Sequence, residues 1–275
     1  MPDPNLWKSI RSGLEFIRGG FPLRRIQIPC DRLTGVSVFF FSDLHLRRQR
    51  VYSLPYPVLS WSRTDEIQER LRKVLAAYPA DVIVSGGDLI SEPGMAEEAF
   101  GLLKNLPDAR LKIAVRGNWD DLKFPEVPRQ KWLDGYREAG FRFLCNETLQ
   151  WNGINFYGTD DRKKGVPAYT PAEDDTDYRI LLSHNPDVVA DLDTDADLTL
   201  CGHTHGGQWR IPFFGAVVTS SAYGKRFEGG VYHRIRRGRT QCLVVSAGIG
   251  TTLVPLRLFC SPEVCRVEFI SGGQL

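Results

Sequence analysis

Two histidines separated by one residue follow a short apolar run late in the chain. They are His203 and His205, two of only five histidines in 275 residues, and glycines stand on both sides of them. A His-x-His at a strand end can direct both imidazoles toward one concave site, because neighbouring glycines let the backbone approach closely. Imidazole nitrogen is a ligand for Zn, Fe and Mn, so the pair is a candidate metal site. For an isolated His-x-His, two surface histidines in a loop would be the favoured interpretation, so the metal interpretation requires matching ligands elsewhere.

Matching ligands follow four other apolar runs, each with the length and composition of a buried strand. They are Asp43 and His45 after 36–41, Asp88 after 81–87, Asn118 after 111–117, and His184 after 178–183. Open α/β sheets place their sites at the carboxyl ends of strands. Singly, each residue could be a turn former or a helix cap. Together with His203 and His205, they predict one metal centre built from five strand ends.

The ordered set of motifs resembles the five sequence blocks of the calcineurin-like metallophosphoesterase superfamily. The blocks are Asp43-x-His45, Gly87-Asp88, Gly117-Asn118-x-Asp120, His184 and Gly202-His203-Thr204-His205. The resemblance implies one metal on Asp43, His45 and His205, a second on Asn118, His184 and His203, and Asp88 as the bridge. It also implies that Asp88, Asn118 and His203 bear most directly on catalysis. Carboxylates and imidazoles without cysteine suit Mn, which we expect, and also Fe or Zn.

The chain after His205 is similar to a subgroup of small bacterial phosphodiesterases that includes a UDP-2,3-diacylglucosamine pyrophosphatase. The similarity lies in residues 206–208, 248–251, 255–257 and 262–264. It implies hydrolysis of a phosphodiester or pyrophosphate bond. The most specific expectation is cleavage of UDP-2,3-diacylglucosamine, a lipid-linked nucleotide sugar, to acyl-sugar 1-phosphate and UMP in lipid A synthesis. Two alternatives stay open: a nucleotide or general phosphodiesterase with a soluble substrate, and a metal-binding scaffold without catalysis.

Trp119 departs from the superfamily pattern, which commonly has histidine at this position. That histidine is assigned to protonating a leaving alcohol or to stabilising the transition state, and an indole has no suitable pKa for proton donation. A phosphate-type leaving group departs without a proton. The substitution therefore favours pyrophosphates or activated diesters over phosphomonoesters. Trp119 is also a candidate for substrate binding by stacking on a base or sugar, with packing at the rim as the alternative.

Four arginines are candidate phosphate contacts, with surface salt bridges as the alternative. They are Arg47, Arg116, Arg210 and Arg257. Arg47 begins an insertion, 47–62, which starts beside His45 and must lie at the mouth of the site. Its arginines suit a phosphate and its aromatic and aliphatic residues suit an acyl chain, or the segment packs on the body of the protein.

The remaining pattern predicts a single α/β domain over residues 1–275. Within the N-terminal segment 1–20, residues 5–17 predict an amphipathic helix, and further helices are expected at 64–78, 95–104 and 129–138. Strands are expected at 23–28, 36–41, 81–85, 110–115, 141–144, 178–182, 197–200, 231–236 and 241–245, with an Asn-Gly hairpin at 149–156. Two mixed sheets flanked by helices, a four-layer αββα sandwich, is the expected architecture.

Composition restricts the class of partner. A net charge of +2 with a pI near 8.2 gives no strong field for nucleic acid, and no obligate protein partner is inferred. The six cysteines are spread without Cys-x-x-Cys spacing, which favours reduced thiols and leaves disulfides open. No apolar run reaches 18 residues and no signal peptide is recognised. We therefore expect a cytoplasmic protein. The amphipathic N-terminal segment could contact the inner membrane face peripherally, or it could pack on the domain.

Overall fold

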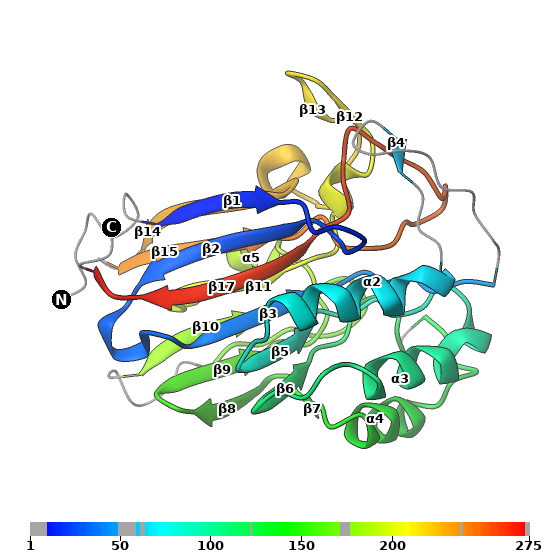
Figure 1. The fold of residues 1–275 in the computed structure, drawn as a ribbon, viewed down its shortest axis with the longest axis horizontal. Coiled ribbons are helices and arrows are strands. Elements are labelled where there is room, and N and C mark those ends of the chain that lie inside the picture. Colours follow the sequence, from blue (N-terminus) through cyan, green and yellow to red (C-terminus); the bar gives the residue numbers. More distant parts are fainter. Residues whose placement is uncertain are drawn as a thin grey trace.

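The computed structural model describes residues 10–48, 59–60, 64–121, 123–170, 177–236 and 239–272. These residues form two large mixed sheets stacked face to face, with helices on the outside (Figure 1). The first sheet has seven strands in the order β1 (Arg11–Glu15), β2 (Leu23–Pro29), β17 (Val264–Ile270), β3 (Ser37–Phe41), β5 (Val82–Ser85), β6 (Leu111–Ala114) and β7 (Arg142–Phe143). The second has six, in the order β14 (Gly230–Arg236), β15 (Arg239–Val245), β11 (Leu198–Cys201), β10 (Tyr178–Leu182), β9 (Ile154–Gly158) and β8 (Glu147–Trp151).

Two short ribbons and several helices complete the described part of the chain. The ribbons are β12 (Arg210–Ile211) with β13 (Gly215–Ala216), and β16 (Arg257–Leu258) with β4 (Leu59–Ser60). The α-helices are α2 (Thr64–Ala77), α3 (Ala96–Lys104), α4 (Arg129–Glu138) and α5 (Val188–Asp191). The 3-10 turns are η1 (Asp31–Leu33), η2 (Pro93–Met95), η3 (His205–Gly207) and η4 (Gly224–Phe227).

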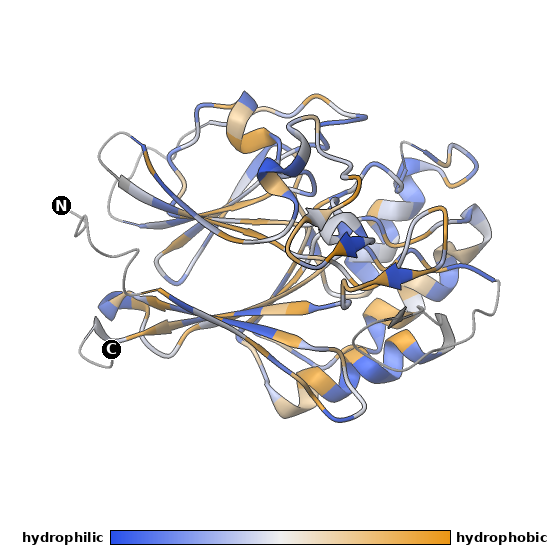
Figure 2. Cartoon of the chain, turned by 90° about the horizontal axis from the view of Figure 1, so that it is seen from above, coloured by the Kyte–Doolittle hydropathy of each residue, from blue (hydrophilic) through white to orange (hydrophobic). Residues whose placement is uncertain are grey.

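The apolar residues divide into three layers that explain the stacking. Alternate residues of a strand point to opposite faces, so Phe40 lies between the sheets while Phe39 and Phe41 face the helices α2, α3 and α4. In the second sheet Ile180 lies between the sheets, and Leu181 packs outward with α5. In Figure 2 the orange, hydrophobic stretches run along the strands of both sheets. The expected αββα sandwich is confirmed.

Parallel pairing brings the carboxyl ends of the central strands to a common edge in each sheet. In the first sheet β3, β5, β6 and β7 are parallel neighbours. In the second, β9, β10, β11 and β15 are parallel, and antiparallel β8 and β14 form the edges. The segments that follow these strands can therefore meet at one end of the sandwich.

Most expected elements are present, and one is wrong. Residues 11–15, expected within an N-terminal helix, instead form β1, which pairs antiparallel with β2 from Arg11 opposite Gln27 to Glu15 opposite Leu23. The glycines at 19 and 20 turn the chain, and pairing with the free edge of β2 outweighs a weak helical pattern that Gly13 interrupts. Residues 1–9, and all of the 47–62 insertion except 47–48 and 59–60, lie outside the described residues.

The structure contains the expected Asn-Gly hairpin, and it also bears on whether a helix could cross a membrane. Asn152 and Gly153 both take positive φ angles, 48° and 73°, as a two-residue primed turn between β8 and β9 requires. Among the described residues, no helix has the length and apolar character needed to cross a bilayer.

The packing between the sheets predicts a large effect for truncating Phe40. We expect Phe40→Ala to lower the free energy of unfolding by about 3 to 5 kcal/mol, because this fully buried ring fills the space between the sheets. The control is Phe16→Ala, which removes a ring that is 63% exposed and should change stability by less than about 0.5 kcal/mol. Urea unfolding measures both, and equal effects would contradict the layer assignment.

Candidate metal centre

Five of the seven predicted ligands have left-handed backbone conformations at the strand ends. The φ angles are 56° for Asp43, 46° for His45, 56° for Asp88, 71° for His203 and 52° for His205. For residues other than glycine this conformation costs about 1 to 2 kcal/mol each. Such strain is typical of functional sites, where it fixes the direction of side chains. The chain thus leaves β3, β5 and β11 by sharp turns that direct the polar side chains toward the centre.

Asp43 and two histidines form the first group of candidate ligands. The Oδ1 atom of Asp43 is 3.4 Å from Nε2 of His205, and the rings of His45 and His205 have centroids 4.9 Å apart. The Oδ2 atom of Asp43 accepts a 2.6 Å hydrogen bond from Ser42 Oγ. Asp43, His45 and His205 are buried, and their ligand atoms all lie within 4.8 Å of one another. One metal ion could therefore be held by this first trio.

Asp88 connects the first trio to a second one. Its Oδ2 atom is 3.4 Å from His45 Nε2 and 3.2 Å from His184 Nε2, while its Oδ1 atom accepts the backbone N–H of Trp119 at 2.8 Å. His203 completes the second trio, with Nδ1 at 3.1 Å from His184 Nε2. Oδ2 of Asp88 thus faces both trios, as a bridging ligand would.

The unpaired polar atoms of the centre fit a cation. Nε2 of His45, His203 and His205 and Oδ1 of Asn118 are buried without a hydrogen-bond partner. Burying unpaired polar atoms is unfavourable, so native proteins pair them or place them on a metal. Asn118 stands between Gly117, whose Cα approaches Asp88, and Trp119, which bonds to Asp88.

His184 shows the same need for positive charge. Its Nδ1 lies 2.8 Å from the carbonyl of Gly86, to which it can donate, and this leaves a lone pair on Nε2 facing Asp88. Burial would lower the pKa of His184, but the buried carboxylates, Asp88 first, raise that pKa well above its ordinary value. A proton or a metal ion at Nε2 satisfies this arrangement.

Two supporting residues hold the ligand loops in place. Asp120 is buried, and its carboxylate accepts the backbone N–H groups of Asp88, Leu89 and Gly117 at 3.0, 3.0 and 2.7 Å. This carboxylate ties the loop after β5 to the loop after β6. Ser91 Oγ lies 3.1 Å from His45 Nδ1, the ring nitrogen that faces away from the metal position.

Arg257, expected among the phosphate contacts, is instead 1% exposed and bonds to the backbone. Its guanidinium donates to the carbonyl oxygens of Ala247 at 2.7 Å, Gly250 at 2.5 Å and His205 at 3.2 Å. Gly250 N in turn donates to the carbonyl of Asp43 at 2.6 Å. Arg257 therefore joins the loop after β15 to two segments that carry ligands.

The other predicted substrate contacts, three arginines and Trp119, lie in different surroundings. Arg47 contacts Ser91 and the carbonyl of Thr251, so it lies beside the centre. Arg116 is buried in ion pairs with Asp121 and Asp160, and Arg210 pairs with Glu228 at 2.8 Å. These ion pairs give Arg116 and Arg210 structural partners. Trp119 packs edge-on to His45, with centroids 5.2 Å apart, and Lys123 Nζ lies 2.9 Å from the indole centroid.

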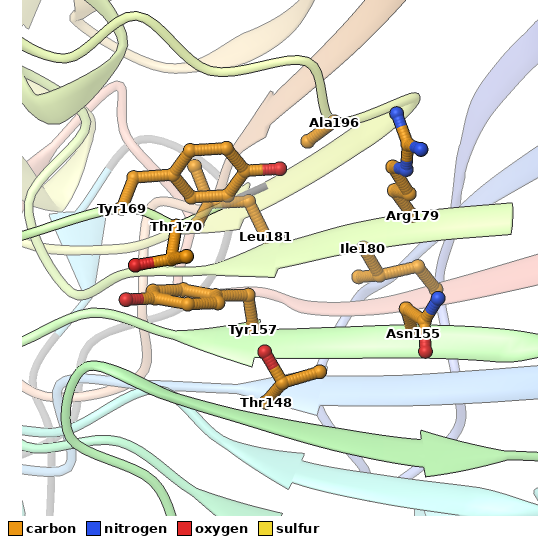
Figure 3. Close-up of a pocket in the computed structure, with 9 residues that line it drawn as sticks. All are labelled: Thr148, Asn155, Tyr157, Tyr169, Thr170, Arg179, Ile180, Leu181 and Ala196. Carbon is orange, nitrogen blue, oxygen red and sulfur yellow. The ribbon is translucent and has the colours of Figure 1, made fainter. Parts of the chain in front are cut away.

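A small pocket elsewhere in the described structure is too small for a substrate. It lies on the second sheet, where the Tyr169 and Tyr157 rings pack edge to face with centroids 4.9 Å apart (Figure 3). Its volume of about 10 Å³ admits about one water molecule. None of its lining residues is a predicted ligand.

Comparison with known families agrees with this geometry. The family model described as calcineurin-like phosphoesterase matches residues 36–207, the segment from the first site strand to the glycines after His205. The chain belongs to the calcineurin-like phosphoesterase family. It is a metal-dependent phosphoesterase, which sets aside the scaffold without catalysis.

Three similar curated proteins come from bacteria. An uncharacterized metallophosphoesterase, YkuE of Bacillus subtilis, is 31% identical over 84% of this chain and 77% of its own length. The phosphodiesterase YaeI of Escherichia coli is 28% identical over 98% of this chain and 90% of its own. The UDP-2,3-diacylglucosamine pyrophosphatase LpxG of Chlamydia trachomatis is 28% identical over 58% of this chain and 50% of its own.

The family's dinuclear centre accounts for the two trios. When bound, two divalent metals supply Lewis-acid activation of water and of a phosphoryl group. The chain's own contribution is to fix the ligand directions, to exclude water from the ligand atoms and to keep one carboxylate oxygen, Asp88 Oδ2, between the two trios.

The shared position of Asp88 predicts the loss of both metals from Asp88→Ala. Removing the carboxylate whose Oδ2 lies nearest to histidines of both trios should empty both positions and lower turnover by at least about a thousandfold. Elemental analysis of purified protein and a phosphodiesterase assay measure this. Asp108→Ala, which changes a fully exposed carboxylate, is the control and should leave both quantities unchanged. Full metal content in Asp88→Ala would refute the bridging assignment.

The contacts of Arg257 predict weaker binding of one metal in Arg257→Met. The carbonyls of Ala247, Gly250 and His205 would lose a donor, so the first trio should bind Mn about tenfold more weakly. Calorimetric titration with Mn should resolve this against Arg110→Met, an exposed control. A binding curve identical to that of the unmodified protein would show that Arg257 does not position His205.

Proposed function

We propose that the centre hydrolyses a phosphodiester or pyrophosphate bond whose leaving group departs without being protonated. The observation that carries this proposal is that nearly all histidines of the chain belong to the candidate metal centre. Of the five histidines in the chain, four belong to the two trios. The fifth, His233, lies in the middle of the edge strand β14 opposite Cys242, on a strand without candidate ligands. No histidine therefore remains to donate a proton to a leaving alcohol.

Trp119 supports the same choice of bond. It follows Asn118, its backbone N–H holds Asp88, and its indole packs against His45 and Phe124. An indole is not an acid at physiological pH, so a strongly basic alkoxide would leave slowly. Phosphate and aryl oxide are weak bases and leave without help. Lys123, whose ammonium lies over the indole, supplies positive charge at this position for a phosphate oxygen.

The proposed roles follow the two trios. Asp43, His45 and His205 would hold one metal, His184, His203 and Asn118 the other, and Asp88 both. Mn is the metal we propose, with Fe and Zn as alternatives that suit the same ligands. Arg47, beside Ser91 and Thr251, is the arginine best placed to meet a substrate phosphate at the mouth.

The most specific substrate we propose is UDP-2,3-diacylglucosamine, with water cleaving the bond between its two phosphoryl groups to give acyl-sugar 1-phosphate and UMP. This substrate is supported by the similarity to a UDP-2,3-diacylglucosamine pyrophosphatase, which extends over 58% of the chain. The second candidate is a soluble phosphodiester, which is favoured by the phosphodiesterase that aligns with 98% of the chain.

A panel of substrates that differ in leaving group tests the proposal. With Mn present, we expect turnover of bis-p-nitrophenyl phosphate and of nucleotide diphosphate sugars. We expect glycerol phosphate, whose alkoxide leaving group needs a proton, to react at least about a hundredfold more slowly. Release of UMP, nitrophenol or phosphate measures the rates. Comparable rates for all three classes would contradict the proposal. Preference for the diacylated nucleotide sugar over its deacylated form would separate the two substrate candidates.

A further inference from the structure

The surface beside the metal centre carries an apolar ridge that the catalytic role leaves unexplained. Two segments form it: 208–218, which includes the β12–β13 hairpin, and 252–259. They contain most of the exposed large apolar side chains of the described residues: Trp209, Ile211, Phe213, Phe214, Val217, Val218, Leu253, Val254 and Phe259. Isolated exposed apolar residues are ordinary, but a contiguous group marks an interaction surface.

Hydrogen bonds hold the two segments side by side. Gln208 Nε2 donates to the carbonyl of Val254 at 2.7 Å, and Trp209 Nε1 donates to that of Leu256 at 2.8 Å. Leu258 N donates to the carbonyl of Gln208 at 3.0 Å. Because Gln208 comes three residues after His205, the ridge is anchored directly at the metal centre.

Folding does not account for the residues at the hairpin tip. Figure 1 shows the β12–β13 hairpin projecting from the body of the molecule. At its tip Phe213 is fully exposed and has a φ of 66°, a conformation that glycine or asparagine adopts at lower cost. Phe214 is 71% exposed. Two exposed phenylalanines on a projecting turn, one of them strained, indicate a role outside the fold.

The hairpin segment and the residues that follow it contain basic but no acidic side chains. The twenty residues from Gln208 to Phe227 include Arg210, Lys225 and Arg226 and no acidic residue. The stretch 246–262 also has no acidic residue, and its one basic residue, Arg257, is buried. Lys225 Nζ lies 4.1 Å from the Phe214 ring centroid and donates to the Phe214 carbonyl at 2.9 Å. Glu228 lies at the hairpin base, where it pairs with Arg210. Aromatic side chains beside lysine suit the interface of a bilayer that contains anionic lipid.

We infer that this ridge, residues 208–218 with 252–259, docks the protein on an anionic lipid bilayer and holds the metal centre close to the membrane surface. A projecting tip of two phenylalanines enters a soft interface and does not match a flat protein surface. The inference deepens the proposed function and rests on it for the choice of a membrane-borne substrate. A diacylated diphosphate lies with its acyl chains in the bilayer and its phosphates at the interface.

Sedimentation with vesicles tests the docking surface. We expect the full chain to sediment with vesicles of phosphatidylcholine and phosphatidylglycerol in equal amounts, and less with phosphatidylcholine alone. The double variant F213S/F214S should reduce partitioning at least about tenfold, because it removes two apolar side chains from the interface. K225Q should reduce it about fivefold, the effect of roughly one kcal/mol for one cation near the surface.

The matched control is I235S, which also removes an exposed apolar side chain, since Ile235 is 64% exposed. Ile235 lies on β14 opposite Thr240, and the Gly230–Val245 pair lies at the other end of that strand. We expect it to bind vesicles like the unmodified protein, and thermal unfolding checks that every variant is folded. The inference is overturned if the unmodified protein stays in solution or if F213S/F214S sediments equally well. It is also overturned if sedimentation velocity shows a dimer that F213S/F214S loses, since a second copy would then cover the ridge.

The docking surface and the proposed function can be refuted independently of each other. Vesicle binding requires no turnover, and bis-p-nitrophenyl phosphate requires no membrane. Turnover of that diester without vesicle binding would refute the docking surface and leave the proposed function standing. Vesicle binding without turnover of any diester or diphosphate would refute the proposed function and leave a lipid-binding surface.

Discussion

The structure depends on two buried carboxylates that face imidazole nitrogens across distances of 3.2 to 3.4 Å. Asp43 and Asp88 are at most 1% exposed, and four of the chain's histidines surround them. Carboxylate oxygens and imidazole lone pairs repel one another in a space without water unless a cation lies between them. Positive charge at this point is therefore required by the fold, and a pair of metal ions meets the requirement at both trios.

The rest of the fold produces this convergence at a conformational cost. Parallel strands bring the carboxyl ends together, and left-handed residues turn the side chains inward. Asp120 and Arg257 then fix the turns by bonding to backbone groups of several loops. Strain in the ligand loops is thus balanced by buried polar residues that touch neither a metal position nor the solvent. This arrangement explains why residues as distant in sequence as Asp43 and Arg257 belong to one functional unit.

Much of the fold and the ligand set could be predicted because both have local signals. Buried strands are continuous apolar runs, and a ligand follows each of the relevant ones at its end. The supporting residues have no such signal: Arg257 meets His205 across 52 positions, and the carbonyls it binds are set by tertiary packing. The N-terminal prediction failed for a related reason, since β1 exists only because β2 offers an unpaired edge. The apolar character of 248–259 is visible in the sequence and suits contact with lipid, but the ridge that this segment forms with 208–218 could not be predicted, since exposure is a property of the folded chain.

The central claim is that the two trios hold two metal ions that share Asp88. Anomalous-difference diffraction from crystals grown with Mn tests it most directly, because it locates each ion without reference to activity. The predicted map has two peaks, one among Asp43, His45 and His205 and one among Asn118, His184 and His203, with Asp88 in contact with both. A map with a single peak, or with peaks away from these side chains, would contradict the claim.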